Sequence, residues 1–297
     1  MLSILIPIYN QDATKLISKL IDQCENANIE YLISVYDDKS SRKWKKLNEP
    51  LHHVFKVNYV ELSENLGRAK IRNWLASAAP HANLLFLDGD SGIVEPRFIE
   101  KYLVEIKKGY DLVYGGTSYS KKPCRSKKRR LHWKYGKTTE AMPAKKRAEN
   151  PAITFHSNNF LIKGKIIEQI KFDEQIKGYG YEDILLAEKI AEAGFNIKHI
   201  DNPVQHLGLE TTEDYLVKVE EAVHNLVKLQ NQGLLADTRL SLYYKKLQKF
   251  HLTGFIPWLY SKTESKIKNK LFAENPDIRA LQLQKLYWYH QAQKSHQ

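Results

Sequence analysis

The chain lacks a long apolar run. No stretch of its 297 residues approaches the roughly 18 consecutive apolar residues that a membrane-spanning helix needs. The apolar start, residues 1–8, also lacks the basic region and the small-residue cleavage site of a secretory signal, and it runs directly into Asn10-Gln11-Asp12. We therefore expect no transmembrane helix, and we interpret residues 1–8 as a first strand.

Cysteine is scarce. Cys24 and Cys124 are the only two, which is too few for a disulfide framework or a zinc site and fits a reducing compartment. The apolar fraction of 42% and the charged fraction of 27% are those of an ordinary globular protein. We expect a cytoplasmic location, which includes the inner face of a membrane.

Acidic residues are nearly absent from one segment. Residues 121–147 hold twelve lysines and arginines against a single acid, Glu140, and thus account for nearly all of the net charge of +12. A basic segment in an otherwise balanced chain indicates one anionic partner surface, and it argues against a protein wrapped by nucleic acid.

Short apolar runs alternate with helical patterns over the first half of the chain. This alternation predicts βαβ units and therefore the α/β class, with a mostly parallel central sheet flanked by helices. The predicted strands are Ser3–Ile8, Tyr31–Tyr36, Val54–Leu62, Leu84–Leu87, Leu112–Tyr114, Ile153–Ile162 and Ile197–Val204, and the predicted helices are 13–26, 66–79, 96–108 and 182–193.

The rest of the chain divides into a loop and a tail. Residues 117–150 show no sustained periodicity and are rich in Lys, Arg and Pro, so we expect a mobile basic loop. The pattern after His206 is helical. We therefore predict a main domain over 1–206, which includes that loop, and a helical C-terminal extension over 207–297.

Acids follow two of the predicted strands directly. Asp88-Gly89-Asp90 comes after the run 84–87, at the sheet edge where open parallel sheets bind ligands. Two such carboxylates repel each other unless a cation lies between them, and Mg²⁺ or Mn²⁺ bridging carboxylates and phosphates would resolve the repulsion. The alternative is a simple Asx-type turn.

Asp37-Asp38 follows the second strand in the same way. These carboxylates could accept hydrogen bonds from a base or a ribose. The alternative is helix capping by Asp38 or Ser40.

A third segment, Asn65 to Asn73, opens a helix with Arg68, Lys70 and Arg72 spread over two turns. Helix N-termini favour anions, so contact with a diphosphate is reasonable. The alternative is a solvated basic helix face.

Adjacent acids also begin the helix at 182. The turn 178–181 alternates glycine with tyrosine and leads directly into Glu182 and Asp183. One acid could act there as a general base, or both could simply complement the helix dipole. His206 follows a later strand, where it could complete a metal site with Asp90 or be structural.

Together, and in this order, these segments resemble the family 2 glycosyltransferases of GT-A fold. The resemblance covers about residues 1–206, and the turn 178–183 is similar to that of chondroitin-polymerase and galactosyltransferase-type enzymes. The residues that carry it are Ser3-Ile4-Leu5-Ile6-Pro7-Ile8-Tyr9-Asn10, Asp37-Asp38-Lys39-Ser40, Asn65-Leu66-Gly67-Arg68-Ala69-Lys70-Ile71-Arg72-Asn73, Asp88-Gly89-Asp90 and Gly180-Tyr181-Glu182-Asp183.

The resemblance implies a nucleotide-sugar site. Pro7 and Tyr9 would lie beside the base, and Arg68 or Arg72 would lie near the diphosphate. Asp37 and Asp38 would accept from the uracil or another base. The full set of implied donor contacts is Pro7, Tyr9, Asp37, Asp38, Asn65, Gly67, Arg68, Arg72, Asp88 and Gly89.

The resemblance also implies a metal and a base. Asp90 would coordinate Mn²⁺ or Mg²⁺, Asp88 would contact the ribose or the metal, and His206 would complete the metal shell. Asp183 would be the catalytic base and Glu182 its partner at the acceptor hydroxyl. The implied reaction is inverting, metal-dependent transfer of a hexose from a nucleoside-diphosphate sugar, UDP-linked in the first instance, to a glycan or lipid-linked glycan, as in polysaccharide or lipopolysaccharide biosynthesis.

Two rival functions come from other classes. A catalytically silent scaffold would bind the sugar nucleotide without turnover, which the intact acid pairs argue against. A nucleic-acid-binding protein could use the basic run 127–130 with Trp133 and Tyr135. That function leaves the acid pairs unexplained, so we expect no nucleic-acid partner.

The basic segment and the helical tail suggest one further partner. Trp258, Leu259 and Tyr260 in the tail, together with the basic loop, could dock on an anionic membrane face that presents a lipid-linked acceptor. In the alternative, the tail packs on the main domain and the loop binds a soluble anionic glycan.

Overall fold

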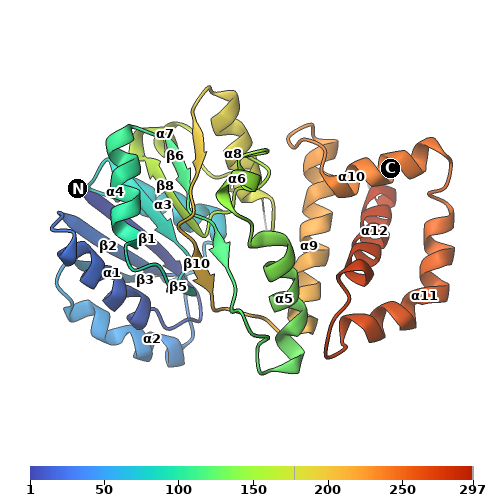
Figure 1. The fold of residues 1–297 in the computed structure, drawn as a ribbon, viewed down its shortest axis with the longest axis horizontal. Helices are drawn as coiled ribbons and strands as arrows, with labels where there is room; N and C mark the ends of the chain where they lie inside the picture. The colour runs from blue at the N-terminus through green and yellow to red at the C-terminus, as the bar shows by residue number, and fades with distance from the viewer. Residues whose placement is uncertain (177, 296–297) are drawn as a thin grey trace. The chain divides into compact units, whose positions relative to one another are not determined.

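The computed structural model describes residues 1–176 and 178–295 of the chain (Figure 1). The contacts between residues divide the chain into two compact units. The first unit comprises residues 1–119, 140–177 and 182–208, and the second comprises residues 120–139, 178–181 and 209–297. The basic segment is thus shared between the two units, and its larger part belongs to the second.

A seven-stranded sheet forms the centre of the first unit, in the order β3-β2-β1-β4-β8-β6-β9. Only β8 runs antiparallel to its neighbours β4 and β6; the other neighbouring pairs run parallel. The predicted α/β class with a mostly parallel sheet is confirmed. The strands are β1 (Leu2–Ile8), β2 (Tyr31–Asp37), β3 (Val57–Glu61), β4 (Asn83–Leu87), β6 (Leu112–Tyr114), β8 (Asn159–Lys163) and β9 (Ile197–His199).

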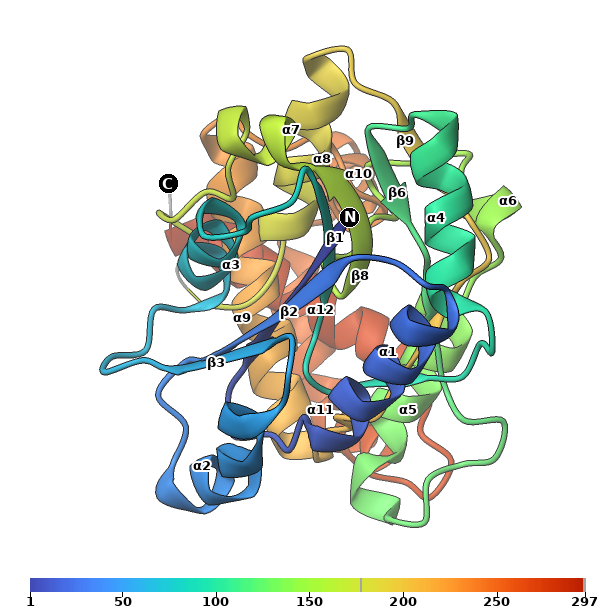
Figure 2. The ribbon, with the colours of Figure 1, turned by 90° about the vertical axis from the view of Figure 1, so that its left-hand side faces the viewer.

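Apolar side chains on both faces of this sheet hold the flanking helices. Because successive side chains of a strand alternate between faces, Ile4 and Ile6 enter the core cluster that contains α1 and α4, whereas Leu5 enters the cluster that contains α3, α7 and α8. Figure 2 shows α1 and α4 together on one side of the strands, and α3 on the other. These helices are α1 (Thr14–Asn26), α3 (Arg68–Ser77), α4 (Phe98–Lys108), α7 (Gly164–Gln169) and α8 (Glu182–Glu192).

A second, three-stranded sheet consists of β5 (Ser91–Ile93), β10 (Val204–His206) and β7 (Thr117–Ser118), with β10 in the middle. Its strand β5 begins directly after the turn that follows β4, and the antiparallel register pairs His206 with Ser91. This small sheet therefore brings residue 206 to the end of β4. The remaining elements of the first unit are α2 (Arg42–Asn48), the 3₁₀ turn η1 (Glu49–His53) and α6 (Ala144–Arg147).

The second unit is helical, and α12 packs against both α9 and α11 (Figure 1). The ring of Tyr260 stacks on that of Tyr287 with centroids 3.7 Å apart, so Tyr260 belongs to this packing. The Thr211 side chain caps α9, and Thr238 and Ser241 form a capping box on α10. The elements are η2 (Lys127–Arg129), α5 (Arg130–Tyr135), the π-helical turn η3 (Gly136–Glu140, which ends in the first unit), α9 (Thr212–Asn231), α10 (Arg239–Lys249), α11 (Phe255–Leu271) and α12 (Ile278–Ser295).

The segment 117–150 is not the irregular loop that its composition indicated; it contains β7, η2, α5, η3 and α6. Within the second unit, the Trp133 indole donates to the Ser120 carbonyl at 3.0 Å, and Leu131 is fully buried. Short helices escape periodicity analysis because one or two turns carry only one or two buried positions. The motion of this segment stays a prediction, as does the domain boundary at 206/207.

Three predicted strands are shorter than expected. The predicted strand 54–62 is reduced to β3, Val57–Glu61. Within the predicted strand 153–162, the ladder starts only at Asn159. The predicted strand 197–204 is split between β9 and β10, which belong to different sheets. No described helix is both long and apolar enough to cross a membrane.

Candidate active site

Asp37 ends β2 and is fully buried. One of its carboxylate oxygens accepts from the Ser40 backbone at 2.6 Å, and the other accepts from the Tyr59 hydroxyl at 3.1 Å. Both oxygens thus have partners within the protein, which favours a structural role. Contact between Asp37 and a nucleotide stays a prediction.

Asp38 fixes the approach to α3. Its two carboxylate oxygens accept from the backbone N–H groups of Leu66 at 2.6 Å and Gly67 at 3.0 Å, and the Asn65 amide donates to the Asp38 carbonyl at 2.9 Å. Burial raises the pKa of Asp38, and the two backbone hydrogen bonds partly offset this effect. These hydrogen bonds tie residue 38 to residues 65–67, and they therefore fix the position of the N-terminus of α3, which begins at Arg68.

The first strand, β1, ends beside the turn that follows β2. Pro7 of β1 lies opposite Tyr36 of β2 in the register, and Tyr9 just beyond it is 54% exposed. Next to it, the Asn10 backbone donates to the Ser40 hydroxyl at 2.7 Å. Tyr9 is thus an exposed ring on a turn that is tied to the end of β2, which suits contact with a flat base.

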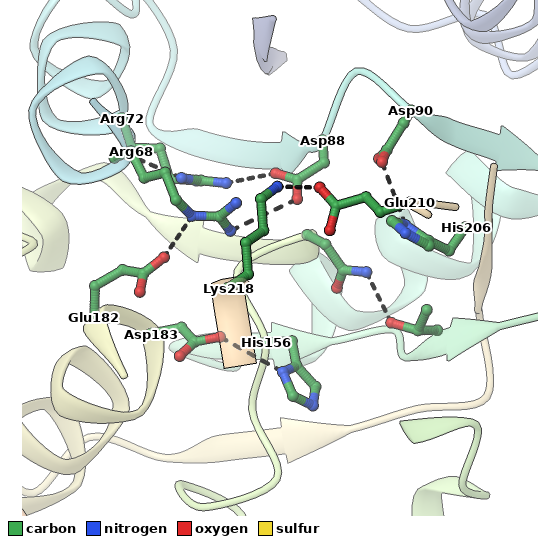
Figure 3. A network of polar contacts seen from close by, with 12 residues as sticks. Arg68, Arg72, Asp88, Asp90, His156, Glu182, Asp183, His206, Glu210 and Lys218 are labelled. Atoms are coloured by element: carbon green, nitrogen blue, oxygen red, sulfur yellow. Dashed lines mark hydrogen bonds and ion pairs between the residues drawn. The ribbon is translucent and has the colours of Figure 1, made fainter. Parts of the chain in front are cut away.

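Two arginines of α3 contact Asp88, and one of them, Arg68, also contacts Glu182 (Figure 3). Arg72 donates to one oxygen of Asp88 at 2.5 Å, and Arg68 lies 4.0 Å from the other. Arg68 also donates from Nε to Glu182 at 2.6 Å. The two arginines are one helical turn apart, so a single helix face supplies both cations.

These ion pairs bear on two expectations, which both stay predictions. The carboxylates of the turn 88–90 were expected to need a cation to offset their repulsion, and the arginines of α3 supply positive charge at Asp88 but not at Asp90. The side chain of Arg72 is only 3% exposed, whereas that of Arg68 is 39% exposed. Of the two arginines proposed for the diphosphate, Arg68 is therefore the accessible one.

Gly89 is required by the packing of the turn between the two acids. A Cβ at this position would clash with the side chains of Ile8 and Gln11. The missing side chain lets the turn lie directly against the end of β1. Sequence spacing alone did not reveal this constraint.

Asp90 and His206 lie together because of the ladder between β5 and β10. Asp90 Oδ2 lies 3.3 Å from His206 Nδ1 (Figure 3), and the Leu207 backbone donates to the Asp90 carbonyl at 3.0 Å. A Cβ on Gly208 would collide with the Asp90 carboxylate, so this glycine keeps space for the acid. Burial raises the pKa of Asp90, while the charges of His206 and Arg68 oppose that shift.

This pair is compatible with a divalent cation. Within residues 1–176 and 178–295, no group of three or more His, Cys, Asp and Glu side chains is arranged to hold a metal. Mg²⁺ commonly takes only one or two carboxylates from the protein and fills its other positions with substrate phosphates and water. A carboxylate beside an imidazole, with Asp88 two residues away, fits such an open site.

Asp183 has a partner that the sequence did not reveal. The acid lies in the first turn of α8, where one oxygen accepts from the Ile184 backbone at 2.8 Å and the other lies 3.5 Å from Nδ1 of His156 (Figure 3). Burial alone would raise the pKa of Asp183, but the hydrogen bond and charge of His156, aided by Arg68, lower it. The same pair raises the pKa of His156 against the effect of burial.

His156 reaches this edge because β8 is antiparallel. Asn159 of β8 pairs with Leu87 of β4, so the residues that precede β8 lie beside the turn that follows β4, and the Asp88 backbone donates to the Asn158 carbonyl at 3.1 Å. The Ser157 hydroxyl and the Asn158 Oδ1 are buried and have no hydrogen-bond partner among the described residues. These polar atoms are candidates for ligand contact.

The turn 178–181 belongs to the second unit and packs against α9. The Asn225 side chain donates to the Tyr179 carbonyl at 3.1 Å. A Cβ on Gly180 would collide with Ala222 of α9. The alternating glycines thus allow close approach to a helix as well as the sharp turn itself.

The fold and the acids at the strand ends define a class, the GT-A-like α/β proteins. The family model of glycosyl transferase family 2 matches residues 3–170. This chain belongs to glycosyltransferase family 2. No curated protein matches the chain significantly by sequence.

Solved structures support the same fold. The mannosyltransferase PcManGT of Pyrobaculum calidifontis, in complex with GDP-Man and Mn²⁺, is 13% identical with a TM-score of 0.54, over 99% of this chain and 86% of that one. S. aureus TarS 1-349 in complex with UDP-GlcNAc is 16% identical with a TM-score of 0.51, over 99% and 91%. Against the longer S. aureus TarS structure, the match covers 100% of this chain and 55% of that one, at 16% identity and a TM-score of 0.51.

Proposed function

We propose that this family 2 glycosyltransferase is an inverting enzyme that moves a hexose from a nucleoside-diphosphate sugar, UDP-linked, to a hydroxyl of a glycan or lipid-linked glycan. The observation that carries the proposal is Asp183, whose side chain is only 15% exposed and is paired with His156 at the sheet edge that also bears Asp88 and Asp90. A single displacement at the anomeric carbon requires a base for the acceptor hydroxyl and a region that stabilises the negative charge of the leaving diphosphate, and both are proposed to lie at this edge.

Asp183 acts as the base. Because its pKa is lowered, it is ionised at neutral pH and can accept the proton of the acceptor hydroxyl. That oxygen then bonds to the anomeric carbon while the bond from this carbon to the diphosphate breaks. The anomeric centre inverts, the nucleoside diphosphate leaves with the bonding electron pair, and no covalent enzyme intermediate forms.

His156 positions the base. Its ring shares a hydrogen bond with one oxygen of Asp183, and the Ile184 N–H holds the other. The carboxylate is thereby fixed in rotation, which matters because small errors in the placement of a reacting group are costly. Glu182 is held by Arg68, so its proposed role at the acceptor hydroxyl would be exerted together with that arginine.

Positive charge at the leaving group comes from Arg68, whose guanidinium is the accessible one of the α3 pair. Asp90 and His206, with Asp88 beside them, would hold Mn²⁺ or Mg²⁺, which when bound would stabilise negative charge on the diphosphate. The Mn²⁺ and GDP-Man in PcManGT support this assignment by fold similarity. The UDP-GlcNAc in TarS supports a uridine donor in the same way.

The test is Asp183→Asn, with Glu192→Gln on the exposed end of the same helix as the control. Donor binding is measured by thermal shift over UDP-, GDP- and CDP-sugars with Mn²⁺, with Mg²⁺ and with chelator. Turnover is measured as nucleoside diphosphate released in the presence of saccharide and lipid-linked acceptors. We expect Asp183→Asn to lose at least about 10²-fold in turnover and to keep its donor-induced shift, while the control retains both. Equal loss of donor binding would contradict the base assignment.

A further inference from the structure

The second unit carries large apolar side chains on its surface. Leu242 and Tyr243 of α10, Phe250 in the connection to α11, and Phe255, Trp258 and Leu259 of α11 are all more than half exposed. Phe255 and Trp258 reach 62% and 61%. We call these six residues, with the lysines between them, the α10–α11 face.

Helical spacing aligns the side chains of α11 in one stripe. Positions 255, 258 and 259 are three and four residues apart, and Lys262 and Lys266 continue the same line, because such positions lie on one face of a helix. Other positions of this helix face the core of the unit, since Ile256 and Ile267 are buried. The exposed stripe of α11 is thus an additional apolar face, separate from the one that packs on α12.

The same arrangement holds on α10. Leu242, Tyr243 and Lys246 are exposed, and they fall on one side of the helix by their spacing. Ser241 and Tyr244 face the interior of the unit. Each of these consecutive helices therefore presents an aromatic and aliphatic stripe with lysine beside it.

Positive charge predominates along the sequence of this face, and among the described residues only Lys245 and Lys270 pair with acids just outside it, Asp237 and Asp277. Residues 239–272 contain eight lysines and arginines and a single acid, Glu264. Lysine can keep its ammonium in water while its stem lies along apolar surface. Exposed aromatic and aliphatic side chains flanked by lysines are typical of helices that lie in the interface of an anionic bilayer.

We propose that the α10–α11 face docks on the surface of a bilayer that contains anionic phospholipid. The occupant is a lipid surface and not a second copy of the chain, because a two-fold dimer through this face would place the same lysines against each other. The inserted side chains are Phe255, Trp258 and Leu259, while Lys246, Lys262 and Lys266 contact the headgroups. This docking is independent of the proposed catalytic function, and it would bring the enzyme to lipid-linked acceptors.

The first test is vesicle flotation. Full-length protein is mixed with phosphatidylcholine vesicles, or with vesicles that also contain phosphatidylglycerol, at low and moderate salt. We expect flotation only with the anionic vesicles, and less of it at higher salt. The pair Phe255→Ser and Trp258→Ser should reduce the fraction bound by roughly tenfold or more. As a control, Phe55→Ser removes an aromatic side chain that is 83% exposed in the first unit and should leave flotation unchanged.

Charge is tested in the same assay. Lys262→Glu with Lys266→Glu should abolish flotation at moderate salt. The matched pair Lys15→Glu with Lys43→Glu changes two exposed lysines of the first unit and should have little effect. Donor-induced thermal shifts serve as the folding check for each variant, because they depend on the first unit and are expected to persist.

Insertion is tested by fluorescence. Lipids brominated near the headgroup quench tryptophans that enter the bilayer, and we expect quenching of the wild-type protein that is largely lost in Trp258→Phe although flotation is retained. Flotation that is unchanged by the Phe255 and Trp258 variants would overturn the proposal. It would also be overturned by no association at either salt concentration, or by a concentration-dependent dimer that these variants abolish without any vesicle binding.

Discussion

His156→Gln tests whether His156 and Asp183, the proposed base, form an ion pair. The imidazole lies 3.5 Å from Asp183, and their side chains are 36% and 15% exposed. At that distance a full ion pair would be worth about 5 kcal/mol with an effective dielectric constant of about 20. Because the imidazole is more than one-third exposed, desolvation and screening reduce the expected net stabilisation to about 1 kcal/mol.

The pH dependence of stability follows from the pKa shifts of His156 and Asp183. The pKa of His156 is raised above 6.5, so its contribution to stability is present below that pH and is lost as the pH rises through the folded-state pKa. The pKa of Asp183 is lowered below 3.8, so its contribution is present above that pH and is lost as the pH falls through the folded-state pKa. The pair therefore stabilises the fold most strongly between pH 3.8 and pH 6.5, the ordinary pKa values of the two groups.

Urea unfolding of the wild type and of His156→Gln at pH 5.5 and pH 9 measures this effect. The substitution should cost about 1 kcal/mol more at the lower pH. In the Asp183→Asn background the extra cost at the lower pH should disappear, since the carboxylate that pairs with His156 is gone. A pH-independent cost in the wild-type background would refute the ion pair.

Turnover gives a second readout of the same variant. Without His156, burial raises the pKa of Asp183 against only the weaker opposition of Arg68 and the Ile184 N–H, so the acid limb of the kcat profile should move to higher pH. The KM for the donor should change little, because the imidazole is proposed to hold the base and not the nucleotide. An unshifted acid limb with a raised KM would instead place His156 in the donor site.

Three further substitutions probe other parts of the first unit. Asp90→Ala should abolish the metal-dependent part of the donor-induced thermal shift, and an unchanged metal titration would count against a metal at Asp90 and His206. Gly89→Ala should destabilise the protein by about 1 to 3 kcal/mol in urea unfolding, because its Cβ overlaps Ile8 and Gln11; a neutral effect would show that the turn can shift. Arg147→Met should lower the free energy of unfolding by roughly 3 to 5 kcal/mol. The arginine side chain is 1% exposed and donates to the carbonyls of Met142, Gly115 and Ile200, which would lose their partner. The loss would appear as a lower urea midpoint, and an unchanged midpoint would contradict it.

Arg147 also shows how a charge run can mislead. It is one of the twelve cations of the basic segment, yet its guanidinium lies 2.9 Å from His199 Nδ1 and over the ring of Tyr114. Burial and the arginine charge lower the pKa of His199 to about 4, so the ring is neutral and can accept at Nδ1. Counting charges along the sequence could not separate this buried arginine from its exposed neighbours.

The sequence by itself determined the sheet and the acids at its edge. Local patterns carry this information, since short apolar runs identify strands such as β2 and β4, and the acids that follow them must lie where those strands end. The juxtaposition of Asp90 and His206 was also anticipated, and the two side chains lie 3.3 Å apart. Their role as metal ligands stays a prediction.

Only the tertiary structure decided which charges meet. Arg68 and Glu182 are 114 positions apart in the chain, and His156 reaches Asp183 because β8 runs antiparallel, a choice that its apolar run did not reveal. The same holds for the short helices of the basic segment and for the exposed stripe of α11. Which of their side chains are buried depends on which neighbouring elements pack against them. A sequence pattern fixes which side chains share a face, but burial and charge pairing depend on what packs against that face, and only the folded chain decides that.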